Sequence, residues 1–170
     1  LLTRAVPEPP APLHKVDYFL SLADAVGVAR RGREYEFFVT DADRAAVAGL
    51  LASAGIAAGA PIAAINPGGN WGPKRWPRER FAALADRLAE SGSAVVIAGA
   101  PKDAALAGEI AALMRSRPVI TAGKTTLGQA GALFERAAVV VSNDSGPMHI
   151  ASAVGANVVA LFGPTSPAIT

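Results

Sequence analysis

From residue 62 onward, short apolar segments alternate with longer amphipathic segments. The apolar segments cover residues 62–66, 94–98, 119–121, 138–142 and 158–162. The amphipathic segments cover residues 78–90, 102–115, 127–136 and 146–154. Short apolar runs are typical of strands buried on both faces, and strands that alternate with helices form parallel βαβ units. The pattern therefore predicts an α/β fold with a doubly wound, mainly parallel sheet.

The residues before this pattern have a different character. Four prolines between residues 7 and 12 favour an extended linker. Three further elements are expected: a helix at 13–28, a short strand at 35–39 and an alanine-rich helix at 41–54. The chain therefore divides into a linker with a connecting helix (1–34) and an α/β domain (35–170).

Composition excludes several classes of protein. The 170 residues are 51% hydrophobic and 18% charged, which excludes a disordered chain. The absence of cysteine excludes disulfides, thiolate zinc sites and a cysteine nucleophile. No apolar run approaches the roughly 20 residues that cross a bilayer. A net charge of +2 gives no indication of a nucleic-acid partner, and we expect none.

The loops that follow the strands are where a site is expected, because ligands of open parallel sheets bind beyond the carboxyl ends of the strands. The loop after the first apolar segment reads NPGGNWGPKRWP (66–77). Its paired glycines allow a ligand to approach the backbone. Lys74 precedes a predicted helix, whose first N–H groups favour anions. The loop is neither a Walker loop nor a GxGxxG motif, and a structural turn with Trp76 as a packing lid is the alternative.

A second loop reads SNDSGPMH (142–149) and opens another predicted helix. Ser145 is expected to cap this helix, and Gly146 to let a ligand approach the backbone, while Pro147 suits the first turn. The free N–H groups of that turn would face a second phosphate. The alternative is a capped helix with Asp144 as a turn residue. Two helix starts that favour anions at one sheet edge predict a diphosphate site.

Two further loops and one histidine are candidates. The loop GAPKD (99–103) places Asp103 at a helix start, where its carboxylate either accepts ribose hydroxyls or only complements the helix dipole. The loop GKTTL (123–127) either walls a nucleobase or caps a helix. For His149, a structural role is favoured over that of a general base. The chain shows no nucleophile triad and no paired-carboxylate motif, and His14 with Asp17 does not make a metal site.

Taken in order, these motifs resemble those of glycosyltransferase family 9, the ADP-heptose:lipopolysaccharide heptosyltransferases and their relatives. The similar segments are PGG (67–69) with KRWP (74–77), GAPKD (99–103), SNDSGPMH (142–149) and LFGPT (161–165). The segment HKVDYFL (14–20) is also similar to a stretch near the inter-domain connection of these enzymes. The resemblance implies the C-terminal half of a two-domain GT-B glycosyltransferase. Residues 35–170 would be its Rossmann-like nucleotide-sugar-binding domain, incomplete at the C-terminus.

The resemblance also implies roles for individual residues. Lys74 and the backbone of residues 144–146 would hold the diphosphate, with Asn70 where the family often has a hydroxyl residue near the same phosphates. Asp103 would bind the ribose hydroxyls, and the turn 124–125 would lie near adenine. The positions expected to bind the donor are Asn70, Lys74, Asp103, Lys124, Thr125, Asp144, Ser145, Gly146, Pro147 and His149.

The activity implied is an inverting, metal-independent transfer of heptose from ADP-heptose to a lipopolysaccharide inner-core acceptor. The whole enzyme would act in the cytoplasm, with peripheral contact at the inner face of the inner membrane. Lys74 and a helix dipole would stabilise the charge of the leaving group. The acceptor site and the general base are expected on an N-terminal domain, so this segment alone is expected to be inactive. Two alternatives stay open: a related transferase with another nucleotide-sugar, and a nucleotide-binding or regulatory module without transferase activity.

Overall fold

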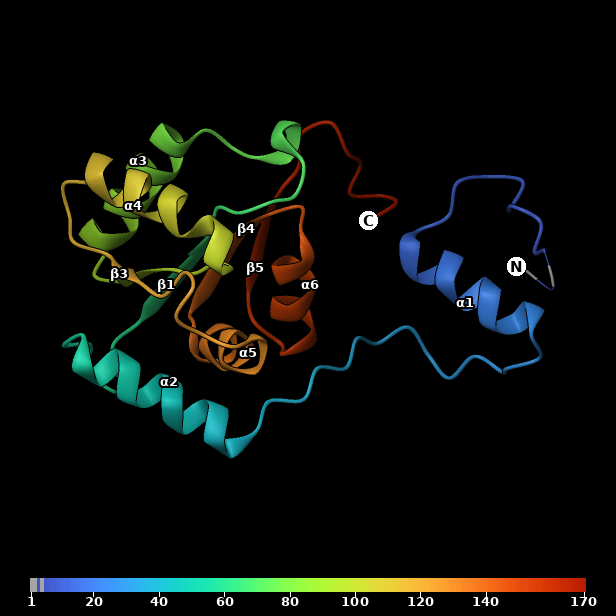
Figure 1. The fold of residues 1–170 in the computed structure, drawn as a ribbon, viewed down its shortest axis with the longest axis horizontal. Helices are drawn as coiled ribbons and strands as arrows, with labels where there is room; N and C mark the ends of the chain where they lie inside the picture. The colour runs from blue at the N-terminus through green and yellow to red at the C-terminus, as the bar shows by residue number, and fades with distance from the viewer. Residues whose placement is uncertain (1–2, 4) are drawn as a thin grey trace. The chain divides into compact units, whose positions relative to one another are not determined.

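The computed structural model describes residues 3 and 5–170 and divides the chain into two units (Figure 1). The larger unit comprises residues 35–164, and the smaller comprises the residues up to 34 together with 165–170. The sequence predicts one domain over 35–170, but its last residues group with the N-terminal unit, where Lys15 N–H donates to the Ile169 carbonyl at 3.1 Å. Residues 1, 2 and 4, which belong to the predicted linker, lie outside the described residues.

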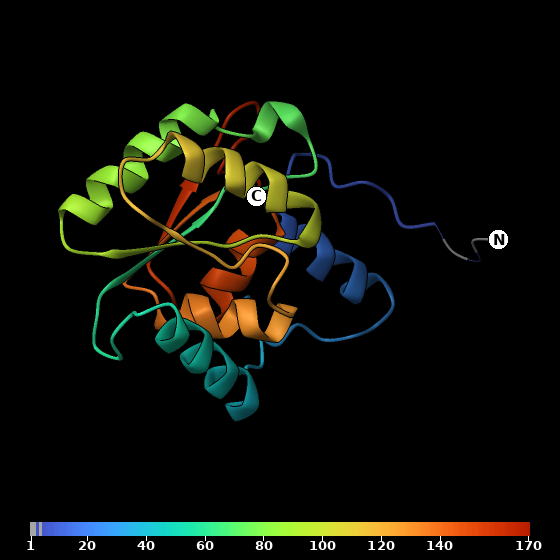
Figure 2. The same cartoon turned by 60° about the vertical axis from the view of Figure 1, so that its left-hand side comes forward.

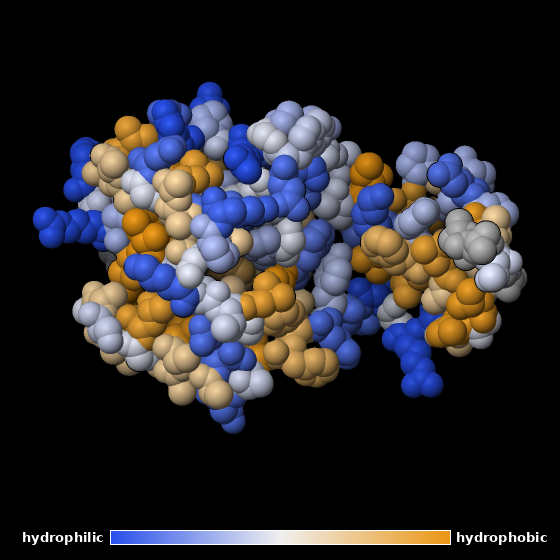
Figure 3. Space-filling model, viewed as in Figure 1, coloured by the Kyte–Doolittle hydropathy of each residue, from blue (hydrophilic) through white to orange (hydrophobic). Residues whose placement is uncertain are grey.

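The smaller unit contains helix α1 (Lys15–Ala25), which lies within the helix predicted at 13–28. The helix begins where it does because the His14 ring, at the N-cap, accepts the Val16 N–H at 3.3 Å. Its apolar side chains are largely exposed: Phe19 and Val26 are each 63% exposed. Figure 3 shows apolar patches on the surface of this unit.

The larger unit is built on five parallel strands in the order β3-β2-β1-β4-β5. They are β1 (Ile62–Asn66), β2 (Ala94–Ile97), β3 (Val119–Ile120), β4 (Val139–Asn143) and β5 (Val158–Leu161). In the central strand, Ala64 pairs with Val96 of β2 on one side and with Val140 of β4 on the other. The chain runs outward from β1 to β3 and then crosses back to β4. The carboxyl ends of β1 and β4 therefore flank the topological switch point, where ligands of such sheets bind.

Helices cover both faces of this sheet (Figures 1 and 2). One face carries α3 (Arg78–Glu90) and α4 (Ala104–Leu113), and the other α2 (Asp41–Ser53), α5 (Leu127–Arg136) and α6 (Gly146–Ala153). Side chains of β1 alternate between the two faces: Ile62 and Ala64 pack in the cluster of Phe134, whereas Ile65 packs in that of Phe81. Burial on both faces explains the uninterrupted apolar runs. The doubly wound parallel fold is thus confirmed.

Residues 35–39 do not form the predicted strand, because they have no partner in the sheet. Phe37 and Val39 of this extended segment pack on α5 instead, whereas Phe38 is 82% exposed. A Cβ atom added to Gly131 of α5 would come within 2.5 Å of the Phe37 ring and 3.2 Å of Val39. A short run of aromatic and β-branched residues can be buried in a sheet or against a helix, so its composition alone did not distinguish a strand from a covering segment.

The helix predicted at 102–115 differs from the observed one in its first turn and in its end. It begins with a 3-10 turn, η2 (Pro101–Asp103), continues as α4 and ends at Leu113. The proline at the start of η2 suits a first turn because its missing N–H is not needed there. The other helices and strands of the larger unit lie within one or two residues of the predicted bounds.

Asp86 of α3 forms hydrogen bonds with the segment that follows α4. Its side chain is buried and accepts the N–H groups of Arg115 at 3.0 Å and Ser116 at 2.9 Å, together with the Ser116 hydroxyl at 2.7 Å. These donors, the Arg115 N–H first, hold the pKa of the Asp86 carboxyl well below its ordinary value. The ionised carboxylate is therefore part of the folded structure.

This lowered pKa predicts acid sensitivity. The pKa of Asp86 is lower in the folded than in the unfolded chain, so its contribution to stability is present above about pH 4 and lost as the pH falls further. We expect Asp86→Asn to flatten the fall in the free energy of unfolding below about pH 4, measured by urea titration. Glu90→Gln, which removes an exposed carboxylate beside Arg115, should keep the slope of the unsubstituted protein. Equal slopes for Asp86→Asn and the unsubstituted protein would contradict the prediction.

Candidate functional site

A cavity of about 400 Å³, here called the first chamber, opens where β1 and β4 end. It is lined by Asn66, Gly68, Gly69, Asn70, Trp71, Lys74, Ala100, Lys102, Asp103, Leu127, Asp144, Ser145, Gly146 and Pro147. A second chamber of about 220 Å³ adjoins it, since Asn66, Ala100, Leu127 and Pro147 line both. The second chamber is lined mainly by apolar side chains, with Thr125 and Thr126 at one wall. A charged space therefore leads into an apolar one.

Lys74 and Asp144 meet in the first chamber from loops far apart in the sequence. The Lys74 Nζ atom lies 2.6 Å from Asp144 Oδ2, and the two side chains are 26% and 3% exposed. The nearly buried carboxylate holds the ammonium group at the switch point. Lys74 is thereby positioned before any ligand arrives. A phosphate oxygen that reaches this group would accept a charge-assisted hydrogen bond.

The basic residues between positions 74 and 80 have different partners. Arg75 donates from Nε and Nη2 to the Gly69 carbonyl, at 2.8 and 2.6 Å, and so braces the glycine-rich loop. Arg78 pairs with Glu109 of α4 at 2.7 Å. Of this run, Lys74 alone lines either chamber among the residues that the structure describes.

Asn143, at the end of β4, ties the loop 66–77 to the sheet. It is fully buried, and its Nδ2 atom donates to the Pro67 carbonyl at 2.8 Å and to the Gly68 carbonyl at 3.3 Å. Its Oδ1 atom accepts the Trp76 N–H at 3.1 Å. Sequence reasoning missed this residue as part of the site. Its signal was an amide side chain at the end of an otherwise apolar strand.

Helix α6 directs its first turn at the first chamber, where Gly146 and Pro147 are part of the lining. Ser145 occupies the N-cap position but does not form the predicted side-chain cap. Its hydroxyl donates instead to the Asn143 carbonyl at 3.2 Å, because the extended backbone of Ser145 turns the side chain back toward β4. The positive end of the helix dipole thus faces the chamber, where an anion is favoured.

Helix α3 does not supply the second helix start that the sequence predicts. Lys74 ends a separate 3-10 turn, η1 (Gly72–Lys74), and α3 begins only after Pro77. Its first turn lines neither chamber. The predicted pair of helix starts at one cavity is therefore wrong, and the contribution of the loop 66–77 is Lys74 itself.

Asp103 and Asn70 both line the first chamber. The Asp103 carboxylate is buried beneath Gly68 and accepts the Ala100 N–H at 3.0 Å. The Asn70 carbonyl oxygen accepts a hydrogen bond from Lys102 Nζ. Both residues line the chamber, as predicted, but each already has a partner in the protein.

Gly68 is required for this arrangement. A Cβ atom at this position would lie 2.6 Å from Asp103 Oδ2 and 2.7 Å from its Cγ. Because the carboxylate is buried and bonded, the loop itself must shift. We expect Gly68→Ala to lower the free energy of unfolding by about 1–3 kcal/mol, as overpacking typically does, in urea unfolding. Gly72→Ala is the matched control, since nothing lies within 4 Å of its added Cβ; equal stability of the two variants would refute the requirement.

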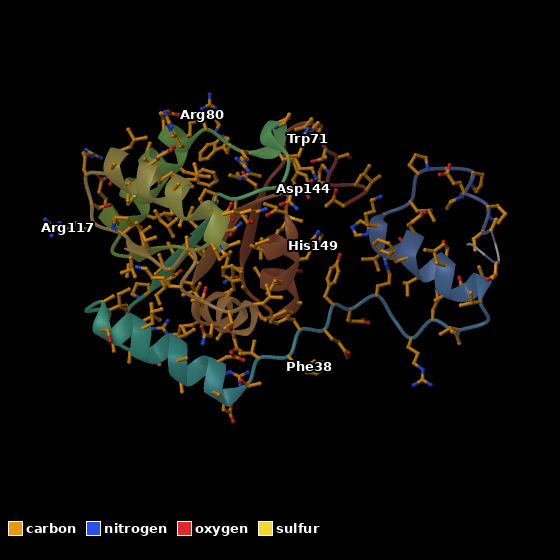
Figure 4. The ribbon with its side chains drawn as sticks, in the orientation of Figure 1. Phe38, Trp71, Arg80, Arg117, Asp144 and His149 are labelled. Atoms are coloured by element: carbon orange, nitrogen blue, oxygen red, sulfur yellow. The ribbon has the colours of Figure 1, made fainter. Side chains whose placement is uncertain are left out.

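The remaining predicted residues are placed unequally. Thr125 lines the second chamber, whereas Lys124 is exposed and lines neither. His149 also lines neither chamber; its ring lies 5.6 Å from that of Tyr35. Figure 4 shows His149 on α6, further from the carboxyl end of the sheet than Asp144. The structure therefore brings the other predicted residues together around the two chambers without these two.

A separate groove of about 400 Å³ runs between α2 and α5. Its walls are mainly apolar, and Arg44 pairs across it with Glu135 at 2.7 Å. This ion pair lowers the pKa of the Glu135 carboxyl. Arg136, the other cation of the lining, donates to the Ala58 and Ala60 carbonyls. Because both cations already have partners in the protein, the groove is a poorer site for an anion than the first chamber.

Among the residues that the structure describes, no three His, Cys, Asp or Glu side chains lie close enough together to hold a metal ion. In the same part of the chain, no helix combines the length and apolar character needed to span a membrane. In the first chamber, positive charge is supplied by Lys74, Lys102 and the start of α6.

A doubly wound parallel sheet with a charged cavity at its switch point defines a Rossmann-like domain of the kind found in GT-B glycosyltransferases. The family model described as glycosyltransferase family 9 (heptosyltransferase) matches residues 1–170, and the chain belongs to this family. The resemblance of the loop motifs is thereby confirmed.

Individual relatives agree with this assignment. Over 115 residues the chain is 44% identical to lipooligosaccharide heptosyltransferase 2 of Haemophilus influenzae, an alignment of 65% of the chain and 33% of that protein. A solved family 9 glycosyltransferase from Veillonella parvula superposes with a TM-score of 0.87 at 28% identity, covering 96% of this chain and 47% of the other. The Escherichia coli ADP-heptose lipopolysaccharide heptosyltransferase II gives 0.81 at 29%, covering 98% and 53%. The chain thus spans about a third to a half of the length of these relatives.

Proposed function

We propose that this chain is the donor-binding part of an inverting, metal-independent glycosyltransferase that moves heptose from ADP-heptose to a lipopolysaccharide inner-core acceptor. Membership of family 9 supports the reaction class, and the 29% identical Escherichia coli relative is named an ADP-heptose lipopolysaccharide heptosyltransferase. One observation carries the donor site: the Lys74 ammonium and the start of α6 face one cavity, which continues into an apolar chamber.

In this proposal the two chambers hold different parts of the donor. The diphosphate lies in the first chamber, between Lys74 and the first turn of α6 at Gly146. The base lies in the second chamber, against Leu127 and beside Thr125. Asp103 lines the first chamber beside Ala100, which lines both chambers. Its carboxylate already accepts the Ala100 N–H, and its remaining lone pairs accept hydrogen bonds from the ribose hydroxyls.

The transfer step follows from where charge develops. An acceptor hydroxyl attacks the anomeric carbon from the face opposite the diphosphate, the bond from that carbon to the phosphate oxygen breaks, and the configuration inverts. The leaving ADP gains negative charge, which Lys74 and the dipole of α6 stabilise. The acceptor proton is taken by a general base on the N-terminal domain of the whole enzyme. The whole enzyme would work in the cytoplasm, at the inner face of the inner membrane.

Titration calorimetry with ADP, UDP, GDP and NAD, each with and without EDTA, tests the donor site. We expect ADP to bind most tightly and EDTA to leave its affinity unchanged. Equal or absent binding of all four would overturn the donor-site proposal, and loss of ADP binding in EDTA would overturn its independence of metal. Heptose transfer to a lipopolysaccharide acceptor by the full-length protein separates a transferase from a nucleotide-binding module without transfer chemistry.

A further inference from the structure

Trp71 is a part of the first chamber that the proposed diphosphate contacts leave unused. It is 51% exposed, yet it lines the chamber together with Lys74 and Asp144. Figure 4 shows Trp71 on the loop after β1, at the same end of the unit as Asp144. A large aromatic side chain gains free energy when it is taken out of water. Its exposure at the mouth of a charged cavity therefore suits contact with a bound ligand.

The order of the chambers determines which part of the ligand Trp71 would meet. Thr125 and Phe134 line the second chamber only, whereas Trp71 and Lys74 line the first chamber only. The proposed function puts the base in the second chamber and the diphosphate at Lys74 and Gly146. The ribose end of the diphosphate then points toward the residues that line both chambers. The group on the other phosphate then lies in the part of the first chamber that Trp71 borders.

The loop holds Trp71 ready for such a contact. The Trp71 carbonyl accepts the Lys74 N–H at 3.1 Å. This hydrogen bond belongs to the turn η1, which begins at the next residue. On the N-terminal side of Trp71, the Gly69 carbonyl accepts hydrogen bonds from Nε and Nη2 of Arg75. Because hydrogen bonds already hold the backbone of this loop, a ligand contact at Trp71 costs little backbone ordering entropy.

We infer that the indole of Trp71 packs against the sugar of the bound nucleotide-sugar and makes the site prefer an ADP-sugar over ADP. The inference rests on the proposed function. The C–H groups on one face of a pyranose ring form an apolar surface that fits the flat face of an indole, while the hydroxyls stay at the edge of the contact. Trp71 is thus a residue for donor specificity rather than for the chemical step.

Fluorescence tests the contact directly, because the chain has two tryptophans. The second, Trp76, packs edge-on against Phe81 at a ring distance of 5.1 Å and lines neither chamber. In Trp76→Phe, emission comes from Trp71 alone, and we expect ADP-heptose to change it more than ADP does. In Trp71→Phe, emission comes from Trp76, and ADP-heptose should not change it more than ADP does. Equal responses of Trp71 to ADP and ADP-heptose would overturn the inference.

Affinity provides the second readout. We expect Trp71→Ala to weaken ADP-heptose binding about tenfold and ADP binding by less than about twofold, measured by calorimetry on the full chain. Equal weakening of the binding of both ligands, or unchanged binding of ADP-heptose, would overturn the role of Trp71 without affecting the donor-site proposal. Failure of the unsubstituted chain to bind either ligand would instead overturn the donor site, and with it this inference.

Discussion

Replacing Lys74 with alanine is expected to weaken ADP binding about 10- to 100-fold, the range that follows from removing one charge-assisted hydrogen bond. The ammonium group is 2.6 Å from Asp144, whose side chain is 3% exposed, so it is held at the chamber before the ligand binds. Its loss removes a side-chain cation from the first chamber and leaves the negative charge of Asp144 less compensated beside the proposed diphosphate. Titration calorimetry with ADP measures the effect.

Two controls keep this result interpretable. Lys102→Ala removes the other lysine of the first chamber, which is exposed and bonded to Asn70; we expect less than about threefold loss, as for exposed charges in general. Urea unfolding of Lys74→Ala shows whether the fold survives the loss of the ion pair with Asp144. ADP affinity within twofold of the unsubstituted chain in a folded Lys74→Ala variant would remove Lys74 from the donor site.

Replacing Asn143 with leucine is expected to lower the free energy of unfolding by about 2–4 kcal/mol, a large part of the 5–15 kcal/mol typical of domains. Leucine has the same number of side-chain heavy atoms in the same branched arrangement, but it neither donates to the Pro67 carbonyl nor accepts the Trp76 N–H. These backbone groups would lose the partner that holds the loop 66–77 to β4. We expect ADP affinity to fall as well, because Lys74 is carried on that loop. Urea unfolding and ADP calorimetry measure the two effects.

The matched control is Asn157→Leu. The Asn157 side chain is also an amide that donates to a backbone carbonyl, that of Ala138 at 3.1 Å, but at an exposed position away from the chambers. We expect a loss of about 0.5–1.5 kcal/mol, the value of a single hydrogen bond, and unchanged ADP affinity. Similar losses for Asn143→Leu and Asn157→Leu would show that Asn143 does not organise the loop.

Local signals predicted most of the fold. Thr126 caps α5 through its own side chain, Pro77 precedes α3, and Gly92 with a φ of +91° follows it. Such signals act over a few residues, so these helices begin and end where the sequence predicts. The strand predicted at 35–39 was wrong because a short run of aromatic and β-branched residues can be buried equally well in a sheet or against a helix.

The sequence predicted which loops form the candidate site but not the contacts between their residues. The loops 66–77, 99–103 and 142–149 were recognisable because glycine, proline and polar residues interrupt apolar runs. That Ser145 leaves α6 uncapped, that Lys74 precedes a 3-10 turn, and that Lys124 and His149 lie outside both chambers depended on the neighbours of each residue in space.

By itself, then, the sequence determined the alternation of strands and helices, the parallel sheet, and the family to which the chain belongs. The tertiary structure alone decided that Lys74 pairs with Asp144 and that Asn143 holds the loop of Trp76, contacts across 70 and 67 residues of chain. The physical reason is the crossover in the strand order: β4 returns to the side of β1, and only this return brings the two loops to one edge of the sheet.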